Sequence, residues 1–528
     1  MGAADQSEAA CGKCKTPITV LRWAVGVRVS MWLRTAKSKQ VLTGLVLLLS
    51  GCAVGPNYKK PQTWTPPAWK IAQAGSKGSV TIPDAPDVNW WNIFQDPELT
   101  SLEKRIATEN LDVQRGTAQL AESRAQLVLA GAERFPALSA SGSYARAQYS
   151  SQNLRRIVSH IAESTGGGIG QLLDQNASNA TIPLLDRWRD GVDATWEVDL
   201  WGRVRRQYEA AQAYLDESTE QRRSVLIARE ADLARDYMTL RGTQKQLAIL
   251  QHNRDDAQRV LELSTSRYQH GLVSELDQEE ARSELEAIQA QIPQLEQEAK
   301  LEINAISLLM GTPPGSLDAE LSTPTEFQPV PPRVPVGLPS ELAERRPDIR
   351  AASDELHAAT AEVGQAIADF YPRVTIDASF GMQSFSFRDL GLWNARAWNV
   401  GPTITIPIFQ GGRLAGQLEL KKASQKAAAI QYRKTVLSAW KDVDDALTAF
   451  TKDGQRTDDL AAKKAADQRA YELTLERYRH GMDSFLRVLD SERRFFGSSQ
   501  ALAGGIEQES VDVVRLYGAL GGGWEGAF

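Results

Sequence analysis

The stretch GVDATWEVDL at residues 191–200 alternates strictly between apolar and polar side chains. One parity consists of Val192, Ala194, Trp196, Val198 and Leu200, and the other of Gly191, Asp193, Thr195, Glu197 and Asp199. A period of two residues predicts a β-strand with one apolar face and one polar face.

Three further stretches show the same alternation, beginning at Ala137, Arg373 and Asn399, and the one at Ala137 is the weakest. Each predicted strand has about 9–11 residues, the length that a tilted membrane strand needs. The pattern is typical of a transmembrane barrel wall, although half-buried strands of a soluble sandwich would give it too. Pro407 is expected to end the fourth strand, and Pro402 to make it irregular, because proline removes a ladder donor.

Four strands are too few for a closed barrel within one chain. The smallest single-chain barrels have about eight strands, and open sheet edges do not persist in lipid. If the sheet lies in a membrane, the chain must therefore oligomerise. Two copies would supply about eight strands, with an interior filled by side chains, and three would supply about twelve, which leaves a channel.

An internal repeat organises the rest of the chain. RYQHGLVSELD begins at Arg267 and RYRHGMDSFLRVLD at Arg477, an offset of 477 − 267 = 210 residues. WGR at 201–203 and GGR at 411–413 share this offset, as do LMG at 309–311 and ALG at 519–521. Several landmarks at one offset indicate a duplicated unit.

Each repeat contains a predicted helical hairpin, 204–268 with its return to 309 and 414–478 with its return from 484 to 518. The first returning helix carries apolar residues at coiled-coil spacing: Ala281, Leu285, Ile288, Ile292, Leu295, Ala299, Ile306 and Leu309. Pro293 is expected to kink it. Ser274 with Asp277 approximates a capping box, and Ser484 is the corresponding N-cap.

The N-terminal segment predicts an export signal. Basic residues precede the apolar run VLTGLVLLL at 41–49, which is too short to cross a bilayer as a helix. LSGC at 49–52 resembles a bacterial lipobox, which implies cleavage before Cys52 and acylation of that cysteine. We expect translation to start at Met31, so that residues 1–30 are a spurious extension, although a long basic leader is the alternative.

The bulk composition argues against two function classes. The net charge of −6 and the pI of about 5.7 do not suit a nucleic-acid binder. The five histidines show no metal-ligand spacing, and no nucleophile-elbow or Walker motif occurs. We therefore expect neither an enzyme nor a metal site, and no cofactor other than the lipid on Cys52.

Taken together, these stretches resemble a known family. They are the lipobox, GVDATWEVDLWGRVRR from Gly191, the two RYxHG stretches, LLMG from Leu308, RRPDIRAA from Arg345, FYPRVTIDASFG from Phe370 and GPTITIPIFQGGR from Gly401. The chain is similar to the outer membrane factor (TolC-like) family, in its OprM/NodT-type efflux lipoprotein branch.

The resemblance implies a mixed α/β membrane protein. Such proteins form homotrimers, in which four strands per chain build a 12-stranded outer-membrane β-barrel, continued by a periplasmic α-helical coiled-coil barrel. They are passive conduits that export small molecules, such as drugs, toxic organics or metals, from an RND-type inner-membrane pump through a periplasmic adaptor protein. The expected location is the cell outer membrane, lipid-anchored and extending into the periplasm.

The implied organisation has four parts. Residues 1–51 form the signal peptide with its extension. Residues 52–311 form the first repeat, with an equatorial segment, a helix, the β-hairpin 137–200 and the helical hairpin 203–310. Residues 312–340 form an equatorial linker. Residues 341–528 form the second repeat, with a helix, the β-hairpin 373–408, the helical hairpin 413–518 and a tail. An excess of about 26 residues between the first two strands predicts a long outer loop near 150–188.

The resemblance also implies site residues. Leu486 and Asp490 would form constricting rings at the channel gate, whereas seam packing for Leu486 and a solvated helix face for Asp490 are the alternatives. Arg487 stands where some relatives carry a second aspartate. The adaptor-contact residues at the hairpin tips would be Gly271, Leu272, Ser274, Gly481, Met482 and Ser484. The lumen-facing barrel residues would be Asp193, Glu197, Asp199 and Asp377.

Two other functions fit parts of the sequence. The chain could be the outer-membrane exit duct of a type I protein secretion system. A lipid-anchored periplasmic coiled-coil structural protein would explain the heptads but leave the alternating strands unused.

Overall fold

The computed structural model describes residues 53–62, 80–82, 84, 87–148, 184–325, 333–337 and 342–523. The chain divides into two units, Met1–Cys52 and Ala53–Phe528, and all the described residues belong to the second. The predicted signal peptide, Cys52 and most of the predicted loop near 150–188 lie outside the described residues.

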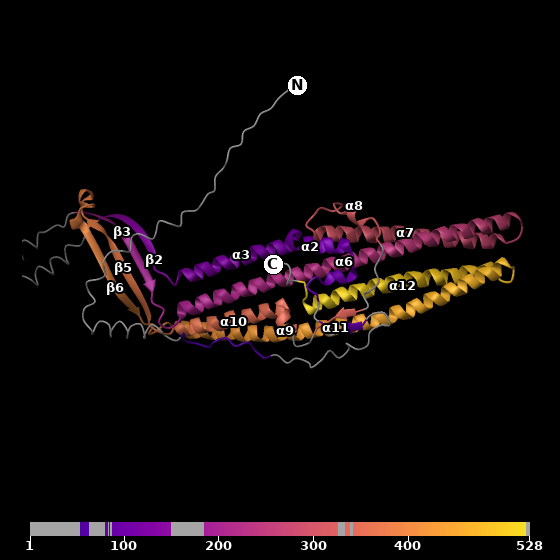
Figure 1. The fold of residues 1–528 in the computed structure, drawn as a ribbon. Coiled ribbons are helices and arrows are strands. Elements are labelled where there is room, and N and C mark those ends of the chain that lie inside the picture. Colours follow the sequence, from indigo (N-terminus) through magenta and orange to yellow (C-terminus); the bar gives the residue numbers. More distant parts are fainter. Residues whose placement is uncertain are drawn as a thin grey trace, which may run out of the picture. The chain divides into compact units, whose positions relative to one another are not determined.

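A four-stranded antiparallel sheet forms where the alternation predicts strands (Figure 1). The strands are β2 (Ala137–Ala147), β3 (Leu185–Glu197), β5 (Arg373–Ser384) and β6 (Arg396–Thr405), paired in that order. β3 and β6 begin earlier than the alternation indicated. The expected irregularity at Pro402 was wrong, because β6 pairs through this residue, which an edge strand tolerates.

The register places like residues side by side across the whole sheet. One cross-strand row reads Leu138, Ala194, Ala378 and Val400, and the next row reads Ser139, Asp193, Ser379 and Asn399. One face is therefore apolar and the other polar on all four strands. In the described sheet, β2 and β6 each pair with one strand only, and each leaves one edge free.

The helices next to the sheet repeat the strand order. They are α3 (Leu111–Ala132), α6 (Arg203–Gln269), α10 (Pro347–Ala368) and α11 (Arg413–Arg479). α3 packs on α6, α6 on α10, and α10 on α11, so α3 and α11 are the ends of the row (Figure 1). No helix in the described part of the chain is long and apolar enough to span a membrane.

The two helical hairpins have matched lengths. α6 and α11 contain 67 residues each, and they return as α7 (Glu275–Leu309) and α12 (Phe485–Leu520). The predicted seam of α7 is confirmed, with Ala281, Leu285 and Ile288 at most 4% exposed. α7 continues as one helix through Pro293, and the kink stays a prediction.

A second layer packs around the middle of the hairpins. Its elements are β1 (Val80–Ile82), η1 (Trp90–Phe94), α2 (Pro97–Glu109), α8 (Asp318–Leu321), β4 (Arg333–Pro335) and α9 (Leu342–Arg345). β1 and β4 pair in parallel, so the two segments expected to be equatorial meet there. The largest hydrophobic cluster joins Trp90 of this layer to Tyr237, Phe450 and Tyr517 of the long helices. The short helices η3 (Phe387–Asp389) and η4 (Trp393–Ala395) connect β5 to β6.

Candidate functional site

Hydroxyl and carboxylate side chains line the polar face of the sheet. Ser141 donates a hydrogen bond to Asp193 (Oγ–Oδ2 3.1 Å). Asp377 accepts from Thr195 on one neighbouring strand at 3.1 Å and from Thr403 on the other at 3.0 Å. Two of the predicted lumen-facing residues, Asp193 and Asp377, therefore lie on one hydrogen-bonded polar surface.

The other two predicted lumen residues lie at the junction between sheet and helices. Glu197 is the last residue of β3, and Asp199 lies beyond it, so assigning Asp199 to the strand was wrong. The chain has already begun to turn there, and the Asp199 carboxylate accepts from the backbone N–H of Arg205 at 2.9 Å in the first turn of α6. This carboxylate satisfies a helix N–H that has no intrahelical partner.

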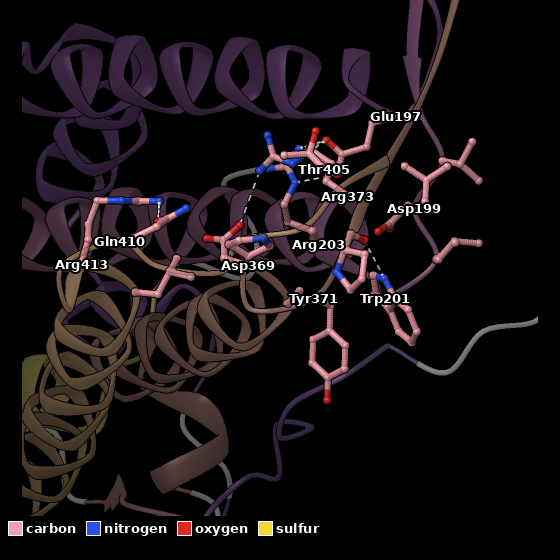
Figure 2. Close-up of a pocket in the computed structure, with 17 residues that line it drawn as sticks. Glu197, Asp199, Trp201, Arg203, Asp369, Tyr371, Arg373, Thr405, Gln410 and Arg413 are labelled. Atoms are coloured by element: carbon pink, nitrogen blue, oxygen red, sulfur yellow. Dashed lines mark hydrogen bonds and ion pairs between the residues drawn. The ribbon is translucent and has the colours of Figure 1, made fainter. Parts of the chain in front are cut away.

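A cavity of about 340 Å³ occupies this junction, and ionic side chains line it (Figure 2). Arg203 binds Glu197 through two nitrogens, at 2.8 and 3.0 Å, and also Glu133 at 3.3 Å. Arg373 lies 3.6 Å from Glu197 and 3.7 Å from Asp369. Bidentate arginine–carboxylate pairs fix orientation as well as charge, so this network joins β3 and β5 to the helices that follow and precede them.

An aromatic pair closes the other side of the junction. Trp201 stacks on Tyr371 with ring centroids 4.8 Å apart, and its indole N–H donates to the carbonyl of Pro372 at 2.9 Å (Figure 2). Gly202, which follows, has φ +86° and allows the chain to turn into α6. The second repeat has Gly411 in place of the tryptophan.

The charged side chains at this junction connect the sheet to the helices. Its charged residues of both signs largely compensate one another, and it contains neither histidine nor cysteine. Among the residues that the structure describes, no group of three or more His, Cys, Asp and Glu could hold a metal ion.

Residues 53–62, which we call the strap, bind beside the same junction. Val54 donates to the carbonyl of Trp201 at 3.0 Å, and Asn57 accepts from Arg206 at 2.7 Å. Gly55 has φ +92°, and a Cβ at this position would lie 2.5 Å from the Cα of Gly364 on α10. The strap therefore contacts both α6 and α10. Position 55 requires glycine, because the backbone has a positive φ angle there and a side chain would clash with Gly364.

The two hairpin tips share one backbone geometry. Gly271 and Gly481 have φ +69° and +70°, and Leu272 and Met482 each donate to an arginine carbonyl five residues earlier at 2.9 Å. These are left-handed helix ends of the kind that favours glycine. The adaptor-contact residues predicted in the two repeats therefore occupy equivalent positions.

The tips differ in how the returning helix is capped. Ser274 forms a reciprocal capping box with Asp277, as predicted. Ser484 is the N-cap of α12, but its side chain makes no cap hydrogen bond. Arg487, three positions on, has no acceptor that could return a bond to the Ser484 backbone N–H as Asp277 does for Ser274. Asp483 binds Arg477 instead, at 2.8 Å.

Apolar side chains are exposed at both tips. Leu272 and Met482 are 73% and 59% exposed, and Leu276 and Leu486, which also match at the repeat offset, are 66% and 58% exposed. Four exposed large apolar side chains on two turns are typical of a surface that a partner covers.

The predicted gate residues lie on the exposed face of α12. The exposure of Leu486 excludes packing in a seam within the single chain. Asp490 is exposed too, and it is paired with Arg494 one turn later on the same helix. The i,i+4 spacing of Asp490 and Arg494 is visible in the sequence, but the gate prediction for Asp490 did not include this arginine.

The two hairpins of one chain meet just behind the tips. The Arg267 guanidinium lies 4.6 Å from the centre of the Tyr478 ring, so the first hairpin contacts the second. A buried cluster of Ala281, Tyr478, Phe485, Val488 and Leu489 continues this contact.

Comparison with known proteins gives the chain a family. A model described as "Outer membrane efflux protein" matches residues 102–312 and 338–522. The toluene efflux pump outer membrane protein TtgC of Pseudomonas putida is 32% identical over 493 residues, which cover 92% of this chain and 96% of that protein.

Two further matches agree. Outer membrane protein OprJ of Pseudomonas aeruginosa is 30% identical, with coverage of 91% and 95%. A solved structure of the outer-membrane channel OprN superimposes with a TM-score of 0.79 at 30% identity, covering 90% of this chain and 100% of the other. The sheet, the paired helical hairpins and the sequence match thus converge, and the chain belongs to the outer membrane efflux protein family.

Proposed function

We propose that this chain is the outer-membrane channel subunit of a tripartite efflux system. Three copies form a passive conduit that receives small molecules from an RND-type inner-membrane pump through a periplasmic adaptor. The observation that carries the proposal is a sheet with one apolar and one polar face and, in the described part of the chain, with two unpaired edges.

The free edges favour a ring of copies. β2 runs away from its helix and β6 runs towards its helix, so β6 of one copy and β2 of the next have the antiparallel directions needed for pairing. Lipid offers no partner for backbone N–H and C=O groups, so the edges must be satisfied by protein. Three copies supply 3 × 4 = 12 strands, enough for an open interior.

The ends of the helix row carry matching exposed stripes. On α11 the exposed apolar stripe is Leu420, Ala423, Ala427 and Ile430, and on α3 it is Ala118, Ala121, Ala125 and Val128. Both have the 3-4-3 spacing of a coiled-coil seam. All eight residues lie within about 17 residues of the helix end that faces the sheet, Arg413 in α11 and Ala132 in α3, which is roughly 26 Å at 1.5 Å per residue. Packing α11 of one copy on α3 of the next would continue the ring below the strands.

The strap supports a lipid anchor. Ala53 is the residue after the predicted acylation site, and it lies so close to Gly202 that a Cβ there would be 2.6 Å from the Ala53 Cβ. An acyl group on Cys52 would thus be attached one residue from the base of the sheet. The adaptor is assigned to the exposed apolar tips, and Leu486 and Asp490 to the constriction.

The names of the relatives favour small-molecule efflux as the purpose of the conduit. TtgC is described as part of a toluene efflux pump, and a further relative, ArpC, as part of an antibiotic efflux pump. We assign the same broad class of cargo to this chain.

The test uses the full-length chain expressed in a Gram-negative host. We expect a heat-modifiable trimer in outer-membrane extracts, ion conductance in planar bilayers, and increased susceptibility to drugs or solvents after deletion of the gene. A freely soluble monomer without conductance would overturn the proposal.

A further inference from the structure

Glu492 occupies a position where the coiled-coil seam of α12 calls for an apolar side chain. The seam residues are Phe485, Leu489, Glu492, Phe496, Ser499 and Ala503, at steps of 4, 3, 4, 3 and 4, and all are at most 9% exposed. Glu492 itself is 0% exposed. A carboxyl group is costly there unless it is paired or neutral.

The described residues give this carboxyl one weak hydrogen bond and no cation of its own. The Tyr471 hydroxyl of α11 lies 3.4 Å from Oε1, and Oε2 is buried without a hydrogen-bond partner. The adjacent Arg493 points its guanidinium to Glu284 of α7 instead.

Two more carboxylates face Glu492 from the other hairpin, Glu284 on α7 and Asp256 on α6. Glu284 is paired with Arg493, and Asp256 with Arg259 at 2.5 Å and with His252 at 3.6 Å. Within the second hairpin, Tyr471 and Arg493 both lower the pKa of Glu492, and Arg479 lowers the pKa of Tyr471. Ionising Glu492 would therefore add a third negative charge where the two hairpins meet.

Apolar layers enclose this position on both sides. Towards the tip lies the cluster that contains Val488 and Leu489. Away from the tip lies a cluster of Leu250, Ala257, Leu285, Ile288 and Phe496. Both clusters draw residues from both hairpins, so the hairpins cannot part near the tip without exposing Glu492 to water.

We infer that Glu492 is a proton-binding site that locks the two hairpins of each chain together and releases them when it ionises. When the carboxyl is protonated, it packs between the apolar layers. When it loses the proton, the charge gains hydration and escapes Glu284 and Asp256 if the hairpins separate, which widens the tip beside Leu486 and Asp490. The effect on channel opening rests on the proposed channel function, whereas the separation of the two hairpins does not.

The direction with pH follows from linkage. Burial raises the pKa of Glu492 to about 7. The Glu284 and Asp256 carboxylates add to this rise, whereas the Tyr471 hydroxyl and the Arg493 guanidinium oppose it. Because the packed state has the higher pKa, its stability is fully present at low pH and is lost as the pH rises through about 7.

The first experiment measures open probability in planar bilayers between pH 6 and pH 8. For the wild-type protein we expect the open probability to rise by about tenfold per subunit from pH 6 to pH 8. Linkage gives this factor for a group that has a pKa near 7 in the closed state and is already ionised in the open state. Glu492→Gln, which is always neutral, should stay closed at both pH values. Glu286→Gln, at an exposed site on α7, should keep the wild-type profile. A flat wild-type profile, or a wild-type profile in Glu492→Gln, overturns the inference.

A second measurement does not require conductance. Val488→Cys, at a site 1% exposed between the hairpins, is labelled with a maleimide and compared with Met482→Cys, which is 59% exposed at the tip. The ratio of the two rates removes the pH dependence of the thiol itself. We expect this ratio to rise about tenfold from pH 6 to pH 8 and to stay constant in the Glu492→Leu background. A constant ratio in the wild-type background contradicts the lock, whereas absence of current at any pH contradicts only the proposed channel.

Discussion

At the scale of single residues, the pairing of Asp490 with Arg494 changes the expected character of the constriction. Three isolated aspartates around an axis would repel one another and attract cations. With Arg494 bound to each carboxylate, the charges compensate within each copy, so the ring is closer to neutral than three unpaired aspartates would be.

Removing either partner should therefore shift ion selectivity in opposite directions. Arg494→Ala leaves Asp490 unpaired and should raise the cation-to-anion permeability ratio, by about fivefold if the pair contributes roughly 1 kcal/mol. Asp490→Ala should lower the ratio. Reversal potentials in a KCl gradient measure both, and a shift in the same direction for both variants would contradict the pairing.

Glu103 predicts a pH-dependent stability in the layer around the hairpins. It is 1% exposed, and neither carboxylate oxygen has a hydrogen-bond partner among the residues that the structure describes. Burial, together with the nearby carboxylate of Glu230, holds its pKa well above the usual value. The folded state therefore favours the proton, and stability is lost as the pH rises.

Glu103→Gln should leave the unfolding temperature unchanged near pH 4 and raise it near pH 9, because the amide cannot ionise. We expect a gain of roughly 1–3 kcal/mol at the higher pH, the usual cost of an unsatisfied buried polar group. Circular dichroism during heating in detergent measures this. Glu122→Gln, at an exposed site on α3, is the control, and an equal effect there would contradict a role for burial.

At the scale of elements, alternation and heptad spacing were enough to find the strands and the long helices. Both patterns reflect local chemistry, which one sequence contains in full. The boundaries were less predictable, because β3 begins at Leu185 and the residues before Gly191 lack clear alternation. The ionic network at the junction between sheet and helices could not be predicted from local patterns. Arg203 binds Glu133, which is 70 residues away in the sequence.

The unequal caps of the two returning helices give a matched test. Ser274→Ala removes a capping box and should cost about 1 kcal/mol of local helix stability. Ser484→Ala removes a side chain that makes no cap bond and should cost little. Amide hydrogen exchange in the first turn of α7 should therefore accelerate about fivefold, with a smaller change in α12. Equal acceleration would contradict the structural difference.

At the scale of the whole molecule, the two faces of the sheet predict where charge is tolerated. Val400 and Asn399 are neighbours on β6 but lie on opposite faces. Val400→Arg should place a charge in lipid and destabilise insertion by about 2 kcal/mol. Asn399→Arg should insert as well as the wild-type protein, because its charge lies on the polar face. The yield of heat-modifiable protein in the outer membrane measures the difference. Equal loss for both variants would contradict a lipid-facing apolar side.

The exposed stripe of α11 predicts where copies meet. Ile430→Glu puts a charge into the proposed seam and should weaken the trimer, because Ile430 is 61% exposed in the single chain and gains its burial only from a neighbour. Ala429→Glu lies next to it and off the stripe, and it should have less effect. Native electrophoresis of detergent extracts measures both. Retention of the trimer by Ile430→Glu would show that the stripe faces elsewhere.

The strap has a consequence for biogenesis. Its partner Gly364 follows Gly55 by 364 − 55 = 309 residues, and a chain exported from its N-terminus delivers the strap long before that helix. If Cys52 is acylated, the leading end is held at a bilayer while most of the polypeptide is still arriving. The strap can then bind α10 only after the second repeat has been exported, so its contact with Gly364 forms only when the N-terminal segment and the second repeat have packed together.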